Sequence, residues 1–555
     1  MKTLPLPLSL LALGAATFAV LPAQTAAAPA ARTPAMVENI HHQMLSKGGS
    51  FTLPALAAAT AEAAAAADAQ YVSDNEKVAT VEGALIRAVG DGECAIFLTE
   101  KSGRKTKIAR VTIGWPIQNP VLPYSWQIFV PDNEAHVFRN KLYVYGSLDA
   151  GGAYCSPFLA PVATSDLKHW ECKGIAFSSF DKGNVHKGRE LWGSDTHFHN
   201  GKYLLYGAYA WWGEETENNF YVVESDKPEG PFTNFRWVKG NKTKKNIDGI
   251  TPKIFVEKNG ERYIVWAPTL QPVAKNYLLI AKLSSNDTID EASITNLGSL
   301  KDFYEGPSIR KRGDIYYLVY DENCGPITKR NRTPKRLSYA TSRSITGPYI
   351  YRGVILTIED LPGNTNIQGS IEELNGQWFA FYHRALNAAW NRRALCVEKI
   401  EFDADGLIKP IKTTSSGIAE GLDTAKTIWF NTSVFGKNHK PSRTGKYGSI
   451  LVTKRDGAAE IGFRYVFFTG KEKKISLRGS GLQNILSVKI FAGQTLIGET
   501  TASSETSVGS KNTVGSKNTV ASGIVLHDIP AGKSEMTIVI TASANVSLET
   551  LDFGF

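Results

Sequence analysis

The feature that most constrains the fold of this chain is a hairpin pattern that occurs five times in its middle. Each copy is a short strand, a polar turn centred on Asn or Gly, and a strand rich in aromatic residues. The five copies are His136–Gly146, His197–Gly207, Ile254–Trp266, Ile309–Tyr320 and Ile371–Tyr382. They recur roughly every 60 residues, which is typical of a radial or linear repeat rather than of a single sheet.

The length of the repeat indicates which kind of array it forms. Roughly 60 residues suit a four-stranded blade, and the stretches between the hairpins carry strand patterns but no helical periodicity. Five such blades close into a ring, so residues 116–425 are predicted to form a five-bladed β-propeller.

Two further regions of short strands flank the repeat. Alternating apolar runs broken by Gly-containing turns predict a small β-sandwich over residues 36–114. The Gly/Ser/Thr-rich end of the chain predicts a second β-sandwich, of jelly-roll type, over residues 430–555. Its strands are expected at Ser449–Thr453, Glu460–Phe468, Lys474–Leu477, Ser487–Phe491, Gly523–Leu526 and Met536–Ile540. The predicted fold class is therefore all-β.

The first residues predict export from the cytoplasm. Lys2, the apolar run Leu4–Val20 and the small residues Ala26–Ala28 have the pattern of a secretory signal peptide over residues 1–28. We therefore expect a secreted or periplasmic protein. No later stretch approaches about 18 continuous apolar residues, so no membrane span is expected.

Charge and cysteine content exclude several protein classes. The net charge of +9 comes without a long basic block, so nucleic acid is not an expected partner. The five cysteines show no Cys-x-x-Cys spacing, which excludes a zinc ribbon and a dense disulfide scaffold. Cys155 and Cys172 either pair as a local disulfide or remain buried thiols.

Polar residues just upstream of each hairpin are the candidates for chemistry, because the innermost strand of every blade starts near the propeller axis. They are Asp132, Trp192, Asp195, Asp248, Thr251, Glu305 and Gln368. Carboxyl groups from different blades that share one cavity suit glycoside hydrolysis. One is ionised and activates water, while the other is protonated and donates to the leaving oxygen. An isolated acid more often caps a turn or pairs with Arg, but Asp132 and Glu305 occupy matched positions in the repeat.

Several motifs of the repeat resemble glycoside hydrolase family 43. They are Pro131–Phe138, Tyr145–Asp149, Tyr304–Pro307, Thr341–Pro348 and Phe381–Arg384, which occur in the family's order within residues 119–415. The resemblance implies a five-bladed propeller and an inverting mechanism. It also implies that Asp132 is the general base, that Glu305 is the general acid, and that a third acid in blade three tunes the acid's pKa.

Two positions depart from the family pattern. Thr251 stands where the family has the third acid, so Asp248, or alternatively Asp195, would have to take that role; Asp248 is favoured. Gln368 stands where many members have a His near a central ion, which argues against calcium at the axis. We therefore expect no required cofactor and assign no metal site.

Other residues are candidates for binding the substrate. Trp192, Trp211 and Trp212 either stack on sugar rings or pack within blades. Asp195 and Gln368 would contact the substrate from the axis. Arg393 resembles the family's substrate-binding arginine, which donates charge-assisted hydrogen bonds to hydroxyls; the alternative is a salt bridge.

The flanking regions carry resemblances of their own. The N-terminal sandwich is similar to the bacterial immunoglobulin-like domains found beside secreted glycosidases. The C-terminal sandwich is similar to carbohydrate-binding module family 6, through Val452–Gly457, Ile461–Tyr465 and Leu551–Phe555.

These resemblances imply a secreted, inverting glycoside hydrolase. It would remove a terminal β-xylose, α-L-arabinofuranose or galactose-type sugar from a plant or algal polysaccharide or oligosaccharide. The alternative is a non-catalytic, glycan-binding propeller that has lost its third acid, and Thr251 is the feature that favours it.

Overall fold

The computed structural model describes residues 38–53, 69–150, 153–181, 188–209, 220–243, 249–268, 277–323, 334–360, 366–386, 391–441, 449–501 and 519–555. These residues form strands and five short 3₁₀ helices, which confirms the all-β class. None of these helices is long and apolar enough to cross a membrane. The predicted signal peptide and the candidates Trp211, Trp212 and Asp248 lie outside the described residues.

All five predicted hairpins are present. They pair β8 (Glu134–Phe138) with β9 (Lys141–Tyr145), β14 (Leu191–His199) with β15 (Lys202–Tyr209), β19 (Ile250–Val256) with β20 (Arg262–Ala267), β24 (Ser308–Arg312) with β25 (Ile315–Asn323), and β28 (Gly369–Leu374) with β29 (Gln377–Ala385). Each turn has a residue with left-handed backbone, which only Gly and Asn adopt at low cost. This requirement explains why Asn or Gly marks every copy of the repeat.

Further strands extend four of the hairpins on their outer side. They are β11 (Val162–Thr164) and β12 (Trp170–Cys172) after β9; β16 (Phe220–Ser225) and β17 (Thr233–Trp237) after β15; β21 (Tyr277–Leu283), β22 (Thr288–Ile289), β23 (Thr295–Ser299) and β18 (Lys239–Gly240) after β20; and β26 (Pro334–Ser342) and β27 (Ile350–Thr357) after β25. The last hairpin gains one strand, β30 (Arg393–Lys399), and β10 (Phe158–Leu159) pairs separately with β13 (Phe177–Ser178).

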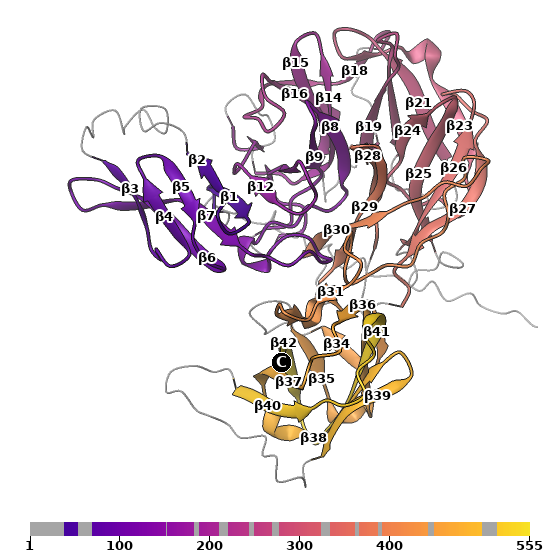
Figure 1. Cartoon of the computed structure of the whole chain (residues 1–555). Coiled ribbons are helices and arrows are strands. Elements are labelled where there is room, and N and C mark those ends of the chain that lie inside the picture. The colour runs from indigo at the N-terminus through magenta and orange to yellow at the C-terminus, as the bar shows by residue number, and fades with distance from the viewer. Residues whose placement is uncertain are drawn as a thin grey trace, which may run out of the picture.

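The first strands of the five hairpins contact one another in a closed cycle, in the order β8, β14, β19, β24, β28 and back to β8. Figure 1 shows the five sheets side by side in the upper part of the molecule. The start of each first strand is thereby brought toward a common centre. Buried Leu, Ile, Val and Tyr side chains fill the space between neighbouring sheets.

The N-terminal region consists of two small sheets around a shared apolar core. One contains β2 (Ser50–Thr52), β5 (Leu85–Ala88) and β4 (Ala79–Glu82), and the other contains β3 (Gln70–Ser73), β6 (Gly92–Thr99), β7 (Lys105–Ile113) and β1 (His41–Leu45). β1 also pairs with β12, where His42 lies opposite Cys172. The N-terminal sheet is therefore continuous with the sheet of the first hairpin.

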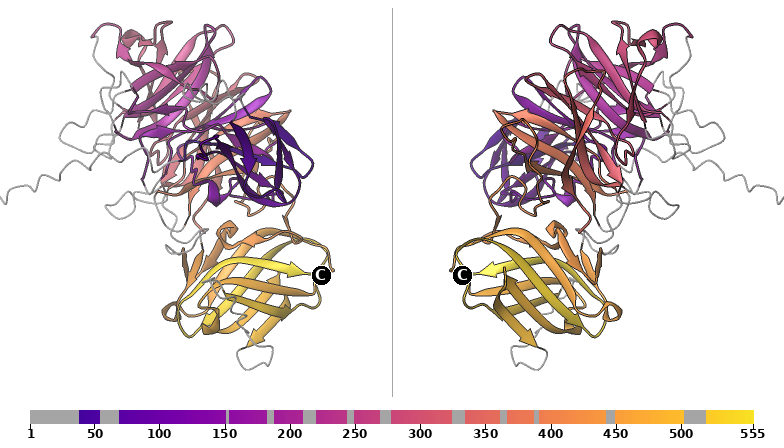
Figure 2. Two further views of the ribbon diagram at one scale, coloured as in Figure 1. Left: turned by 90° about the vertical axis from the view of Figure 1, so that its left-hand side faces the viewer. Right: turned by 90° about the vertical axis from the view of Figure 1, so that its right-hand side faces the viewer.

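The C-terminal region is two six-stranded sheets that enclose one apolar core, and it lies below the rest of the molecule in Figures 1 and 2. The sheets contain β31 (Leu422–Asp423), β33 (Phe435–Lys437), β36 (Ala459–Phe468), β38 (Ile485–Ala492), β39 (Thr495–Thr501) and β41 (Gly532–Ala542); and β32 (Ile428–Trp429), β34 (His439–Pro441), β35 (Ile450–Val452), β37 (Lys474–Ser480), β40 (Thr519–Val525) and β42 (Val546–Gly554). All six predicted strands are present, whereas β31, β32, β33, β34, β39 and β42 were not predicted.

Candidate active site

Cross-strand pairing aligns four of the five first strands in one register. Glu134 lies opposite Tyr145, Asp195 opposite Tyr206, Ser308 opposite Val319 and Ser370 opposite Phe381, and each of these is the fifth pair counted from its turn, so these four first-strand residues are equivalent. In the third hairpin the pairing is irregular between Ile250 and Lys253. Alternate residues of a strand share a face, so Asp132, Gly306 and Gln368, two positions earlier in the first, fourth and fifth hairpins, are also equivalent.

This register corrects two expectations from the sequence. Gly306, and not Glu305, is equivalent to Asp132, so the two acids do not occupy matched positions. Asp195 is equivalent to Glu134 and not to Asp132, so it lies one layer deeper along the first strands than the proposed base. The pairing between Asp195 and the turn is regular, and the irregularity of β14 and β15 lies on the other side, between Trp192 and Asp195.

Asp132 is held as an ion. Its Oδ1 accepts from Arg393 Nη1 at 2.7 Å and its Oδ2 accepts from the Ser147 hydroxyl at 2.7 Å. Burial opposes ionisation of Asp132, but Arg393 and Ser147 outweigh it and hold the pKa of that carboxyl below its ordinary value. A buried carboxylate that remains ionised can accept a proton from water, as a general base must.

Arg393 forms salt bridges with Asp132 and Asp149, which is the alternative to substrate binding that the sequence left open. It is fully buried, and besides Asp132 it donates from Nε and Nη2 to the two oxygens of Asp149, both at 2.9 Å. Its guanidinium carbon lies 4.0 Å from the centre of the Tyr154 ring. The arginine thus orients the Asp132 carboxylate and stabilises its ionised form.

Glu305 is held in the opposite protonation state. Only 9% of its surface is exposed, and its Oε1 accepts from Gln368 Nε2 at 2.7 Å. Burial, followed by the negative charge of Asp132, raises the pKa of Glu305 to about 7. Below about pH 7, Glu305 therefore mostly retains a proton that it can donate.

A chain of hydrogen bonds through His383 and Gln368 connects the two acids. The Asp132 amide donates to Nδ1 of His383 at 3.0 Å, and the His383 amide donates to the Gln368 carbonyl oxygen at 3.2 Å. The Gln368 side chain in turn holds Glu305. The two carboxyl groups come from different hairpins, yet residues 368 and 383 fix both of them. His383 is thus a structural residue here and not a metal ligand.

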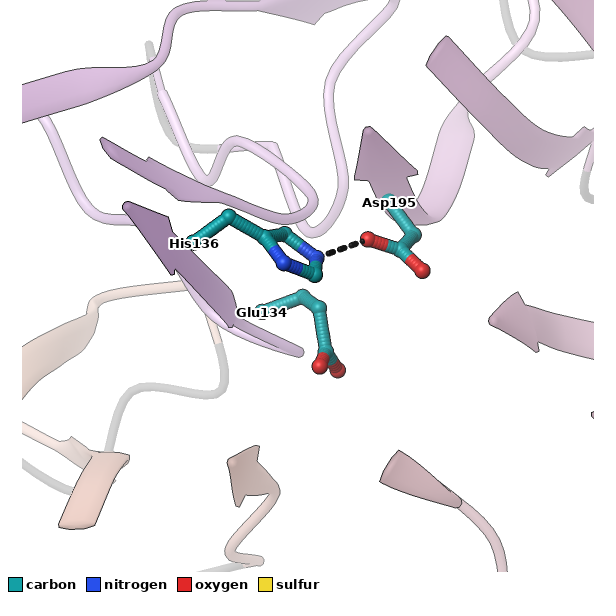
Figure 3. A group of neighbouring side chains, drawn as sticks. All are labelled: Glu134, His136 and Asp195. Carbon is teal, nitrogen blue, oxygen red and sulfur yellow. Dashed lines mark hydrogen bonds and ion pairs between the residues drawn. The ribbon is translucent and has the colours of Figure 1, made fainter. Parts of the chain in front are cut away.

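Beneath the two acids lies a cluster of buried charges (Figure 3). Glu134, His136 and Asp195 place ligand atoms within 4.8 Å of one another, a spacing that would suit a metal ion. Asp195 accepts from His136 Nε2 at 2.6 Å and from the Ile254 amide at 2.6 Å. Burial opposes its ionisation, but His136 outweighs it and lowers the pKa of Asp195 to about 2.

Two side-chain cations already neutralise this cluster. Arg310 Nη1 lies 2.8 Å from Glu134 Oε1, and Lys253 Nζ lies 3.6 Å from Glu134 Oε2. A calcium ion would need these oxygens for itself and would be repelled by both cations. The residues of this cluster therefore do not fit a calcium ion.

The remaining candidates lie around the two acids. Thr251 is buried, and its Oγ1 has no hydrogen-bond partner within the described ranges. Trp192 packs edge-on against Tyr154, with ring centroids 6.2 Å apart, beside Arg393. Cys155 and Cys172 are free buried thiols and not a disulfide.

No role was predicted from the sequence for three residues of the site. Ser147, which donates to Asp132, and Asp149, which accepts from Arg393, both stand in the family-like motif Tyr145–Asp149. Asp321 lies beside Glu305 near the end of β25, where the amide of Asp321 donates to the Glu305 carbonyl oxygen at 3.1 Å. Its only signal was a pair of acids, Asp321 and Glu322, at the end of an otherwise apolar strand.

Comparison with known proteins identifies the family. A family model for glycosyl hydrolases family 43 matches residues 117–408. A xylosidase/arabinosidase from Thermoclostridium stercorarium is 28% identical over 432 residues, which cover 65% of this chain and 85% of that protein. A beta-xylosidase from Xylanibacter ruminicola is 27% identical over 332 residues, which cover 51% of this chain and 97% of that protein.

The solved structures include a beta-xylosidase/alpha-arabinofuranosidase from a compost microbial metagenome, 24% identical, with a TM-score of 0.44. The match covers 54% of this chain and 99% of that one. The family model itself covers just over half of the chain, and the matched residues include both Asp132 and Glu305. The chain therefore belongs to glycosyl hydrolases family 43 and is a glycoside hydrolase.

Proposed function

We propose that Asp132 and Glu305 are the general base and general acid of an inverting hydrolysis. The observation that carries this proposal is their opposite protonation states, which arise although both are buried carboxyl groups. Arg393 and Ser147 keep Asp132 ionised, whereas burial and the charge of Asp132 keep Glu305 protonated. A pair of acids whose pKa values are driven apart is the arrangement that glycosidases use.

The step follows from these states. Asp132 accepts a proton from a water molecule as the water oxygen attacks the anomeric carbon. Glu305 donates its proton to the glycosidic oxygen as the bond from the anomeric carbon to that oxygen breaks. The sugar leaves with inverted configuration, and the carboxyls exchange protons with solvent before the next turnover.

The substrate we propose is a terminal pentose, β-xylose or α-L-arabinofuranose, or a galactose-type sugar, on a plant or algal polysaccharide. The names of the relatives, xylosidase/arabinosidase and beta-xylosidase, support the pentose. A beta-D-galactofuranosidase from Aspergillus niger, 24% identical over 340 residues, supports keeping the galactose type. Trp192, beside Tyr154 and Arg393, is the stacking residue we propose for the sugar.

We also propose the architecture that the sequence predicted. The five sheets would be the blades of a propeller, supported by the closed cycle of contacts among their first strands. The regions 36–114 and 430–555 would be an immunoglobulin-like domain and a carbohydrate-binding module, supported by their paired sheets. The leader pattern of residues 1–28 supports secretion or a periplasmic location.

The glycan-binding alternative rests on Thr251. A protein without a third acid would be inactive only if Glu305 could not keep its proton. Burial and Asp132 raise the pKa of Glu305 with Thr251 in place, which favours the enzyme.

A panel digestion tests the substrate proposal. Wild-type protein and Glu305→Gln are incubated with xylan, arabinan, arabinoxylan and galactan oligosaccharides, and products are separated by chromatography. We expect wild type to release one monosaccharide from chain ends and the variant to release none. Release of internal oligosaccharides would contradict the terminal-sugar proposal.

A further inference from the structure

The buried carboxyl group of Asp321 has no counterpart in the mechanism described above. It is fully buried near the end of β25, and neither of its oxygens has a hydrogen-bond partner among the described residues. A buried polar group without a partner destabilises the folded protein, so the retention of Asp321 requires an explanation. The next residue, Glu322, is equally buried but is fully occupied, because it accepts from Tyr351 and pairs with Arg336.

In two other hairpins, the residue at the position of Asp321 hydrogen-bonds to the proposed base Asp132. Two residues before it, Val319 pairs with Ser308. The same offset in the first and fifth hairpins gives Ser147 and His383, because Tyr145 pairs with Glu134 and Phe381 with Ser370. Ser147 donates to the Asp132 carboxylate, and His383 accepts from the Asp132 amide. The second and third hairpins carry Ala208 and Ala267 at this offset. Of the three polar side chains, two thus hydrogen-bond to the proposed base.

The neighbour of Asp321 at the site is Gln368. Oδ1 of Asp321 and Cδ of Gln368 lie 2.8 and 3.0 Å from the point where a Cβ on Gly306 would stand. The two side chains therefore converge over Gly306, directly after Glu305. Gln368 Nε2 donates to Glu305, but its Oε1 is buried without a partner among the described residues. Two groups of acceptor oxygens that meet without a donor need a proton between them.

We propose that Asp321 is a neutral acid that donates a hydrogen bond to Oε1 of Gln368 and so acts as a positioning residue for the general acid Glu305. The bond fixes which way the Gln368 amide faces. With Nε2 directed at Glu305, Oε1 of Glu305 is an acceptor, and the proton of that carboxyl group resides on Oε2. Asp321 thereby supplies, from the same hairpin as Glu305, the acid that is missing at Thr251.

The charges around Asp321 favour its neutral form. Burial, followed by the negative charges of Glu305 and Asp132, holds the pKa of Asp321 well above its ordinary value, and Lys253 only partly offsets this. A neutral carboxyl at Asp321 also explains how the buried groups 132, 305 and 321 coexist, since below about pH 7 Asp132 is the only one of the three that is mostly ionised. The inference rests on the proposed role of Glu305 as the acid.

The test compares substrates that need an acid with substrates that do not. Asp321→Ala, Asp321→Asn and the matched control Glu322→Gln are assayed on the oligosaccharide that wild type cleaves and on the dinitrophenyl glycoside of the same sugar. A dinitrophenolate leaves with little protonation. We expect Asp321→Ala to lose about 10-fold to 100-fold in kcat on the oligosaccharide but under about threefold on the aryl glycoside.

Asn at position 321 keeps a neutral donor of the same size. We expect the kcat of Asp321→Asn to remain within about threefold of wild type on both substrates. Its activity should also fall near pH 7, as the activity of wild type does. Glu322→Gln should lower kcat by the same factor on both substrates, as a purely structural change does. An equal loss of kcat on both substrates for Asp321→Ala would overturn the proposal. The proposal would also be overturned if Asp321→Asn lost its activity at a lower pH than wild type, because that shift would show that Asp321 acts through a negative charge.

A measurement without turnover covers the case in which Asp321→Ala does not fold. Infrared difference spectra of wild type minus Asp321→Asn at neutral pH should contain the carbonyl band of a protonated carboxylic acid. A carboxylate band in its place would overturn the proposal. Glu305→Gln separates the two levels of the argument: if it cleaves the oligosaccharide normally, the proposed acid is wrong. If it is inactive while Asp321→Ala shows no dependence on the leaving group, only the present inference fails.

Discussion

At the scale of single residues, two buried carboxyl groups differ only in their neighbours. Asp132 faces a guanidinium and a hydroxyl, whereas Glu305 faces an amide and the charge of Asp132. The sequence predicted both residues because their position before a hairpin is visible in the repeat. It could not predict their protonation states, which depend on Arg393 and Gln368 from distant parts of the chain.

The pH dependence of kcat/KM should have two limits. The acid must be protonated, so activity falls as pH rises through about 7, the pKa of Glu305. The base must be ionised, so activity falls again only below the ordinary carboxyl range, because the pKa of Asp132 is lowered. Initial rates on an oligosaccharide between pH 3 and 9 measure both limits. A loss of activity centred near the ordinary pKa of Glu would contradict the raised value.

Arg393→Lys tests how Asp132 stays ionised. A lysine cannot bridge Asp132 and Asp149 with a planar fork, so the pKa of Asp132 should rise. We expect kcat/KM to fall about 10²-fold and the acidic limit to move to higher pH. Arg352→Lys is the control for the loss of an arginine, because that exposed residue donates to Thr341 in β26 and contacts neither acid in the described part of the chain. An unchanged acidic limit in Arg393→Lys would contradict the role of the arginine.

At the scale of elements, the repeat is predictable while its fine register is not. The hairpins were predicted by their turns, because Asn140 and Gly201 are among the few residues that adopt a left-handed backbone cheaply. The irregular pairing of β14 and β15 between Trp192 and Asp195 was not predicted, because a bulge leaves no signal in the apolar pattern. The pairing of β1 with β12 was also unpredictable, since no local pattern reports contacts between residues about 130 positions apart.

Gly306 and Gly313 give a matched test of the element that carries Glu305. Both have positive φ, 67° and 58°, so alanine should cost each about 1 kcal/mol of unfolding free energy. Only at Gly306 would the added Cβ lie 2.8 Å from Asp321, whereas at Gly313 nothing lies within 4 Å. We expect Gly306→Ala to lose most activity and to have the lower Tm, because the buried side chain of Asp321 must shift, whereas Gly313→Ala keeps its activity. Equal activities would contradict the close packing at Gly306.

At the scale of the whole molecule, the C-terminal region is bonded to the strand that carries His383. Arg384 is buried and donates to the carbonyl oxygens of Asn119, Asn431 and Ser433 at 2.7–2.9 Å. The sequence predicted two separate units but not this junction, because a single arginine in a family motif does not indicate its distant partners. The junction links the C-terminal region to the site through adjacent residues.

Arg384→Met should therefore weaken the junction. Three charge-assisted hydrogen bonds are lost and buried carbonyls remain unpaired, so we expect a loss of about 3 kcal/mol in unfolding free energy, measured by urea denaturation. Arg478→Met, which removes an exposed arginine paired with Asp552, should stay within about 0.5 kcal/mol of wild type. A loss of the same size in both variants would show that Arg384 contributes no more than a surface ion pair.

The configuration of the first sugar released tests the central claim most directly. Proton NMR during the first minutes of oligosaccharide cleavage distinguishes the two anomers before they equilibrate in water. The account predicts the inverted anomer from wild type and no release by Asp132→Asn or Glu305→Gln. Release of the retained anomer, or wild-type release by either variant, would contradict the roles of Asp132 and Glu305.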